Sequence, residues 1–221
     1  MSHALTSVDD FLRGAGGFPP GRADRRALRS IVVFLLIAGP IYGLAMGSFA
    51  CDSPQRLLQS LFAAMKMPLL LFATTALCLP AFFVLNTLLG LRGDFAAALK
   101  AVMSAQATLS IALASLAPLT LVWYWSVDSY RAALLFNAAM FAIAAIAGHL
   151  KMQREYRALI ARDPAHRFAL RGWMATYAIV GIQMGWTLRP FIGDPEAPVR
   201  FFRDEPFSNA YIVVLELLLG R

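Results

Sequence analysis

The chain has 221 residues, of which 59% are hydrophobic and only 15% are charged, and its mean hydropathy is +0.61. Soluble domains carry about 25% charged residues, so this composition excludes an ordinary soluble domain and indicates an integral membrane protein. The formal net charge of +7 comes mainly from arginines, and we interpret it as a membrane-topology signal and not as a nucleic-acid-binding surface. Abundant arginine and alanine are typical of a GC-rich genome, so we expect a bacterial protein.

Five apolar segments follow a basic N-terminal arm. Residues 1–29 are polar, contain Gly-Gly and Pro-Pro pairs and several arginines, and should form a flexible cytoplasmic arm. Residues 30–189 contain the predicted transmembrane domain, since a ~30 Å hydrocarbon core needs about 20 apolar residues per helix. The predicted spans are residues 31–50, 67–91, 101–126, 132–150 and 172–188. The sequence therefore predicts an all-α fold, a polytopic transmembrane helix bundle with five spans.

Two further segments are predicted to be amphipathic or interfacial. Residues 51–66 carry apolar side chains at helical spacing, which predicts a helix in the plane of the membrane interface. Residues 190–221 form the predicted extracytoplasmic tail, with four prolines followed by a short apolar helix over residues 208–219. That helix would be only ~18 Å long, too short to cross the membrane, so it either lies in the interface or folds back onto the bundle.

The lysines and arginines are unevenly divided between the two sides of the predicted membrane. Thirteen of the 20 lie in residues 1–30, 92–100 and 151–171, and the other seven lie in the segments on the opposite side. The richer side is cytoplasmic by the positive-inside rule. We therefore expect a multi-pass protein of the bacterial inner membrane, with a cytoplasmic N-terminus and an extracytoplasmic C-terminus.

Four amide side chains lie inside the spans, where no Asp, Glu, Lys, Arg or His is placed deeply. Asn86 and Gln106 fall in the cytoplasmic half and Asn137 and Gln183 in the outer half, each about 9 Å from a membrane edge. One interpretation is hydrogen bonding between helices, and the other is a polar path on which Asn137 and Gln183 bind a solute. The lack of deep ionisable groups argues against a proton-coupled transporter.

Two spans carry glycines one helical turn apart, which are Gly39, Gly43 and Gly47 in the first and Gly181 and Gly185 in the fifth. Small residues at this spacing allow helix backbones to approach closely. We assign them to helix packing together with Asn86 and Gln106. The packing is either intramolecular or part of a homodimer.

The end of the fifth span is the most distinctive stretch of the sequence. Arg189 and Asp194 flank a Pro-Phe-Ile-Gly turn, across which they could form an ion pair. This segment is either a rigid cap on the last span or a fixed surface offered to a partner outside the membrane. Arg189 and Asp194 therefore join Asn137 and Gln183 as candidate binding residues.

The sequence lacks the motifs of the usual intramembrane proteases and of metal sites. The chain has no pair of aspartates within the spans, no His-Glu-x-x-His and no Gly-x-Ser-x-Gly. Cys51 and Cys78 lie in different environments and lack the spacing of metal ligands. We therefore expect no catalytic residues, no metal, no cofactor and no enzymatic activity.

Several stretches resemble a group of uncharacterised bacterial multi-span membrane proteins, namely residues 67–71, 79–90, 117–120 and 183–193. The resemblance covers roughly residues 40–205. This group is similar in topology to the five-span Yip-type membrane proteins, whose eukaryotic members are non-enzymatic adaptors in vesicle traffic. The resemblance implies a cytoplasmic N-terminus and an adaptor role, and it supplies no catalytic residues.

Residues 88–102 also look like the verprolin-homology motif that gives some members of the bacterial group an actin-binding label. That motif needs a free amphipathic helix followed by an extended segment. Here residues 88–91 end one predicted span and residues 101–102 begin the next, so we do not expect actin as a partner. The expected partners are the lipid bilayer and another membrane protein or a second copy of the chain.

The sequence leads to three hypotheses about function. The first is a non-enzymatic adaptor or assembly scaffold of the bacterial inner membrane. The alternative is a channel or facilitator for a neutral small solute, lined by Asn137 and Gln183. A membrane-embedded enzyme is the third.

Overall fold

The structure is a computed structural model that describes residues 25–202. Most of the predicted arm and the predicted helix over residues 208–219 lie outside this range. The described residues form helices and no strand, in agreement with the predicted all-α class. The elements in chain order are α2 (Arg25–Gly47), α3 (Pro54–Leu88), the 3₁₀ turn η1 (Arg92–Asp94), α4 (Phe95–Ser126), α5 (Tyr130–Arg162) and α6 (His166–Thr187).

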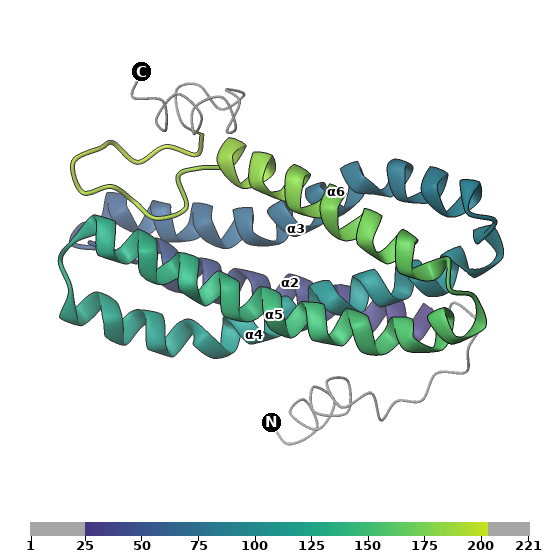
Figure 1. Ribbon diagram of the computed structural model, residues 1–221. Helices are drawn as coiled ribbons and strands as arrows, with labels where there is room; N and C mark the ends of the chain where they lie inside the picture. Colours follow the sequence, from purple (N-terminus) through teal and green to yellow (C-terminus); the bar gives the residue numbers. More distant parts are fainter. Residues whose placement is uncertain (1–24, 203–221) are drawn as a thin grey trace.

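The helices run up and down in one elongated bundle, as Figure 1 shows. The turns after α2 and α4 and the loop after α6 gather at one end, which we call the loop end. The turns after α3 and α5 gather at the other end, which we call the basic end. Short turns force consecutive helices to be antiparallel, so this arrangement follows from the connection lengths.

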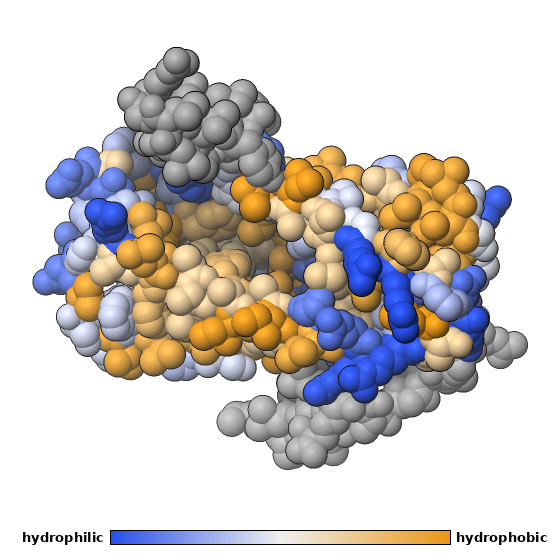
Figure 2. Space-filling view, viewed as in Figure 1, coloured by the Kyte–Doolittle hydropathy of each residue, from blue (hydrophilic) through white to orange (hydrophobic). Residues whose placement is uncertain are grey.

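Three stretches of the described chain are long and apolar enough to cross a membrane, Arg56–Leu88, Arg92–Ser126 and Tyr130–Arg162. The apolar part of α2, Ile31–Gly47, is shorter. The expectation of a helical membrane protein is therefore met at this coarser level. Figure 2 shows a wide apolar zone over the middle of the visible face, with hydrophilic residues gathered toward both ends of the bundle.

The structure differs from the prediction for residues 51–66, because these residues do not form a separate interfacial segment. Pro54 begins α3, which continues without a break through the predicted second span to Leu88. The apolar stripe points outward, since Leu57, Leu61 and Met65 are 56%, 53% and 55% exposed. Small and polar side chains of the opposite face pack on the bundle instead. In lipid the surroundings are as apolar as the interior, so an apolar stripe does not identify the buried face.

The other four α-helices also extend beyond the spans predicted for them, each toward the basic end, and the extension is longest in α5. α5 runs to Arg162, so much of the basic segment expected as a cytoplasmic loop is helical, and α6 begins at His166. Asp94 joins these elements at the basic end, since its carboxylate lies 3.2 Å from Nε2 of His166 and 3.6 Å from Nη1 of Arg162. The His166 side chain is buried, a position that no pattern in the sequence indicates.

The glycine-rich face of α2 lies against α3. A Cβ atom built on Gly43 would lie 2.5 Å from the carbonyl oxygen of Ala63, and one on Gly47 would lie 2.5 Å from Cα of Ser60. Gly39 has more room, with Pro68 at 3.5 Å. These distances support intramolecular packing as the role of the stripe, because a second copy could not reach a face that α3 already covers.

Candidate binding pocket

The loop after α6 is held on the bundle by side chains of α3. Nη1 of Arg56 donates to the carbonyl oxygen of Asp194 at 2.7 Å, and Nη2 donates to that of Pro195. Nε2 of Gln59 donates to the carbonyl oxygens of Pro190 at 3.1 Å and Phe191 at 3.0 Å. A polypeptide loop held by several hydrogen bonds from one helix has a defined conformation before any partner arrives.

Lys66 makes the deepest of these contacts. Its side chain is fully buried, its Nζ donates to the carbonyl oxygen of Pro190 at 2.8 Å, and the ammonium lies 4.7 Å from the centroid of the Phe201 ring. A buried ammonium needs a hydrogen-bond acceptor or an aromatic face nearby, and the loop provides both.

From the sequence we assigned Arg56 and Lys66 only to the outer side of the membrane, as charges, and predicted no contact for either residue. The available signal was their spacing, because Arg56, Gln59 and Lys66 share one face of a continuous helix. Because we predicted a break between residues 66 and 67, we did not treat these three residues as one helix face.

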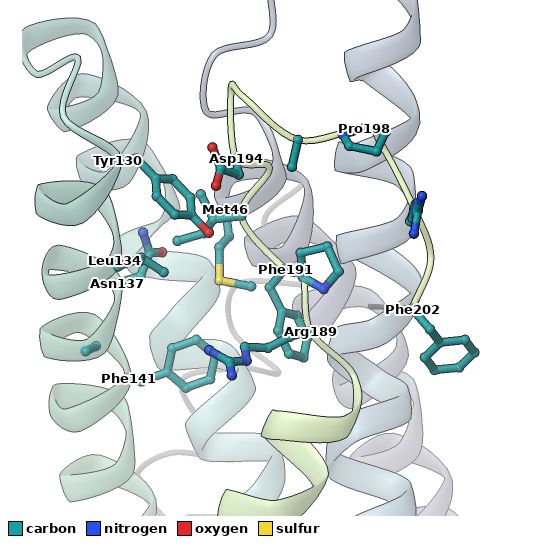
Figure 3. Close-up of a pocket in the computed structure, with 15 residues that line it drawn as sticks. Met46, Tyr130, Leu134, Asn137, Phe141, Arg189, Phe191, Asp194, Pro198 and Phe202 are labelled. Carbon is teal, nitrogen blue, oxygen red and sulfur yellow. The ribbon is translucent and has the colours of Figure 1, made fainter. Parts of the chain in front are cut away.

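A pocket of about 600 Å³ lies at the loop end, between α2, α5 and the loop. Figure 3 shows side chains from these three elements gathered around Met46 and Phe191, while Pro198 and Phe202 lie further along the loop. The residues that line it are Met46, Tyr130, Leu134, Asn137, Ala138, Phe141, Arg189, Pro190, Phe191, Ile192, Asp194, Ala197, Pro198, Arg200 and Phe202. The volume and the mainly apolar walls are typical of ligand pockets, which combine apolar walls with a small number of polar groups.

Three of the four candidate binding residues, Asn137, Arg189 and Asp194, line this pocket. The fourth, Gln183, lies one turn before the end of α6 and is not part of the lining. The two amides assigned to the outer half of the membrane are therefore not brought together in one cavity.

The side chain of Asn137 is engaged in a buried hydrogen-bond network. Its Oδ1 accepts from the hydroxyl of Tyr42 at 2.8 Å. Its Nδ2 donates to the hydroxyl of Tyr124 at 2.6 Å and to the carbonyl oxygen of Ala133 at 2.8 Å. The Tyr124 hydroxyl in turn donates to the carbonyl oxygen of Met46 at 3.2 Å. This network ties α2, α4 and α5 together, which supports the helix-bonding interpretation of Asn137.

Arg189 and Asp194 occupy different parts of the pocket. The guanidinium carbon of Arg189 lies 3.6 Å from the centroid of the Trp186 ring, and Figure 3 shows the side chain extending toward Phe141. Oδ1 of Asp194 accepts from the backbone N–H of Glu196 at 3.0 Å, and the carboxylate lies near Tyr130 in the same view. The ion pair between Arg189 and Asp194 stays a prediction, whereas the hydrogen bonds that hold the loop come from α3.

The remaining packing residues lie elsewhere in the bundle. Nδ2 of Asn86 donates to the carbonyl oxygen of Phe82, within α3. Gly181 faces α3, with the methyl group of Thr74 3.6 Å from an added Cβ, whereas Gly185 has no atom within 4 Å. Gln106 of α4 is buried and hydrogen-bonds the hydroxyl of Tyr177 on α6. Gly185 is thus the one position of this group, within the described residues, where the structure shows no close approach.

No protein-family model, no curated protein and no solved structure matches the chain.

Proposed function

We propose that the protein is a non-enzymatic adaptor or assembly scaffold of the bacterial inner membrane, and that the pocket at its loop end receives an extended segment of a partner membrane protein. The observation that carries the proposal is the loop of residues 188–202, which Arg56, Gln59 and Lys66 hold in place from α3. A preformed site loses less conformational entropy on binding than a loop that must be ordered by its partner.

The chemistry of the pocket suits a peptide with apolar side chains and a charged group. Leu134, Phe141 and Phe202 provide apolar surface, while Arg200 and Asp194 place charges of both signs along the lining. Aromatic and arginine side chains are the types that contribute most to protein–protein binding.

The proposed topology places this pocket outside the cytoplasm. In the proposal all five helices cross the membrane, since α2 and α6 run alongside the three long apolar helices and their ends alternate with them (Figure 1). The basic end, which carries Arg92, Arg162 and Arg167 among others, then faces the cytoplasm by the positive-inside rule.

A channel for a neutral solute has less support. The facilitator hypothesis needs Asn137 and Gln183 on a common polar path, but the Asn137 amide binds Tyr42 and Tyr124 and Gln183 is outside the pocket lining. An amide whose donors and acceptor are already used contributes little to solvating a passing molecule.

The proposal can be tested by site-specific photocrosslinking in native membranes. A photoreactive amino acid at Leu134, an exposed residue of the pocket lining, should give a discrete adduct with a second membrane protein. The same amino acid at Ile143, which is exposed on α5 outside the pocket, should give none. Adducts of equal yield at both positions would contradict a specific site.

A matched pair of blocking substitutions sharpens the experiment. Ala138→Trp places a bulky ring in the pocket, whereas Ala142→Trp, one turn further along α5, adds the same ring outside it. The adduct should disappear with the first substitution and persist with the second. An adduct that maps to residues 203–221 of the same chain would overturn the proposal, since the pocket would then hold the protein's own tail.

A further inference from the structure

A second cavity of about 430 Å³ lies between α4, α5 and α6, away from the pocket at the loop end. Its walls are formed by Val102, Ala105 and Leu109 of α4 and by Trp173 and Tyr177 of α6, among other apolar or aromatic residues. Gln106 and His149 are the lining residues with amide or imidazole groups. The cavity is therefore apolar with polar groups contributed from two helices.

The rim of this cavity faces away from the bundle. Ala145 and Ile146 on α5 and Met174 and Ala178 on α6 line it and are exposed. The helices behind it pack tightly, because a Cβ on Gly148 would lie 2.9 Å from the carbonyl oxygen of Ala105. In a membrane-spanning bundle the exposed apolar rim meets lipid, so the cavity opens sideways to the hydrocarbon.

The polar groups in this cavity have unused hydrogen-bonding capacity. Oε1 of Gln106 and Nδ1 of His149 are buried and have no hydrogen-bond partner within the described residues. Gln106 is only 6% exposed. A buried polar atom without a partner costs about 1–3 kcal/mol, so a ligand that satisfies it gains a corresponding advantage.

The two groups have complementary roles. Nε2 of His149 lies 2.7 Å from Nε2 of Gln153, and because an amide nitrogen donates, the imidazole nitrogen accepts. In the neutral ring the proton then resides on Nδ1. The cavity therefore offers an acceptor, Oε1 of Gln106, and a donor, the Nδ1–H of His149. A hydroxyl group, which donates one hydrogen bond and accepts others, matches both.

We propose that this cavity binds a neutral lipid with a hydroxyl head group. The hydroxyl donates to Oε1 of Gln106 and accepts from Nδ1–H of His149, and the chain lies along Ile146, Met174 and Ala178 toward the bilayer. A charged head group is excluded because the lining contains no Asp, Glu, Lys or Arg to pair with it. A water molecule would meet the same two groups but leave the apolar walls of the cavity uncovered, whereas the chain of a lipid also fills that space.

The proposal is independent of the adaptor function and can be tested with the full-length protein in bilayers. The probes are a long-chain alcohol bearing a diazirine and an alkyne, and its methyl ether, which has the same chain but cannot donate a hydrogen bond. After irradiation, peptide mapping should place the alcohol adduct on residues 145–152 or 173–178. Labelling by the alcohol should exceed labelling by the ether by about tenfold, the effect of one buried hydrogen bond.

Protein variants separate the cavity from general lipid contact. Ala178→Trp fills the cavity and should abolish the mapped adduct, whereas Ala175→Trp, which is exposed on α6 outside the lining, should leave it. Gln106→Leu should retain labelling and remove the preference for the alcohol over the ether. Equal labelling of the wild-type protein by alcohol and ether, or equal labelling of the two tryptophan variants, would overturn the proposal. These outcomes do not require the Gln106 variant to fold.

Discussion

Single residues decide how closely α2 and α3 approach, and Gly43 lies at their contact. An added Cβ there would meet Cα of Ala64 at 2.6 Å, and a backbone atom cannot move aside as the tip of a long side chain can. Gly185, also within a helix, has no atom within 4 Å of the same hypothetical Cβ. The two glycines therefore form a matched pair in which only the surroundings differ.

Gly43→Ala should lower the free energy of unfolding by about 1–3 kcal/mol, because the two helices must separate to admit the methyl group. Gly185→Ala should leave it unchanged or raise it by up to about 1 kcal/mol, since alanine favours a helix over glycine. Thermal unfolding in detergent, followed by circular dichroism, measures both. Equal shifts for the two variants would show that the glycine face makes no special contact.

Asn137 couples to Tyr42 across two helices, and this coupling can be measured. Asn137→Ala leaves the Tyr42 hydroxyl buried without its acceptor, so we expect a loss of about 1–3 kcal/mol. Tyr42→Phe should cost less, and the double variant should cost less than the two single losses combined. Strict additivity in this double-mutant cycle would mean that the hydrogen bond between these side chains contributes nothing to stability.

At the level of elements, α3 joins two segments that we predicted to be separate, the interfacial segment over residues 51–66 and the span over residues 67–91. Its first half supports α2 through Ala63 and Ala64 and holds the loop through Arg56, Gln59 and Lys66. Its second half runs to the basic end and corresponds to the predicted second span. The rigidity of the pocket therefore depends on the continuity of this one helix.

Lys66→Met keeps the length of the side chain and removes its bond to the carbonyl oxygen of Pro190, so the loop should become more mobile. The rate of maleimide labelling at Ala197→Cys, measured without the native exposed thiol by adding Cys51→Ser, should rise several-fold. Lys100→Met, a change of the same type near the basic end, should not alter the rate. An unchanged rate with Lys66→Met would assign the stability of the loop to its other contacts.

At the level of the whole molecule, the proposed orientation places the loop end outside the cytoplasm. Cys51 is exposed in the turn after α2, at the loop end, and Cys78 is buried. The wild-type protein therefore carries its own reporter of topology. An added thiol at Asp163, which is exposed between α5 and α6, reports on the basic end.

A membrane-impermeant maleimide should label Cys51 in sealed right-side-out vesicles, and Cys51→Ser should remove the signal. With Asp163→Cys in the Cys51→Ser background, labelling should require permeabilisation. The reason is the excess of Lys and Arg at the basic end, which the positive-inside rule retains in the cytoplasm. Two results together would show the opposite orientation. They are labelling of the Asp163→Cys variant in sealed vesicles and no labelling of Cys51 in the wild-type protein under the same conditions.

The helical membrane class follows from composition and from the lengths of the apolar segments, properties that need no knowledge of packing. The glycines at 39, 43 and 47 also predicted close packing from spacing alone, since residues four apart share a helix face. The ends of the helices were harder to predict from the sequence. Lipid and protein interior are equally apolar, so the hydrophobic pattern could not show that α3 begins at Pro54 or that α5 continues to Arg162.

The sequence by itself therefore determined the helical membrane class and the glycine packing face, because these depend on membrane thickness and on local spacing. It named Asn137, Arg189 and Asp194 as candidates, but the tertiary structure brings these three residues to one pocket. Only the tertiary structure decided that α3 holds the loop and that the Asn137 amide is fully engaged in hydrogen bonds within the bundle. Arg56, Gln59 and Lys66 are more than 120 positions from their acceptors in the chain, and Tyr42 is 95 positions from Asn137. Contacts at such separations arise from the order in which helices pack, and one sequence carries no local signal for that order.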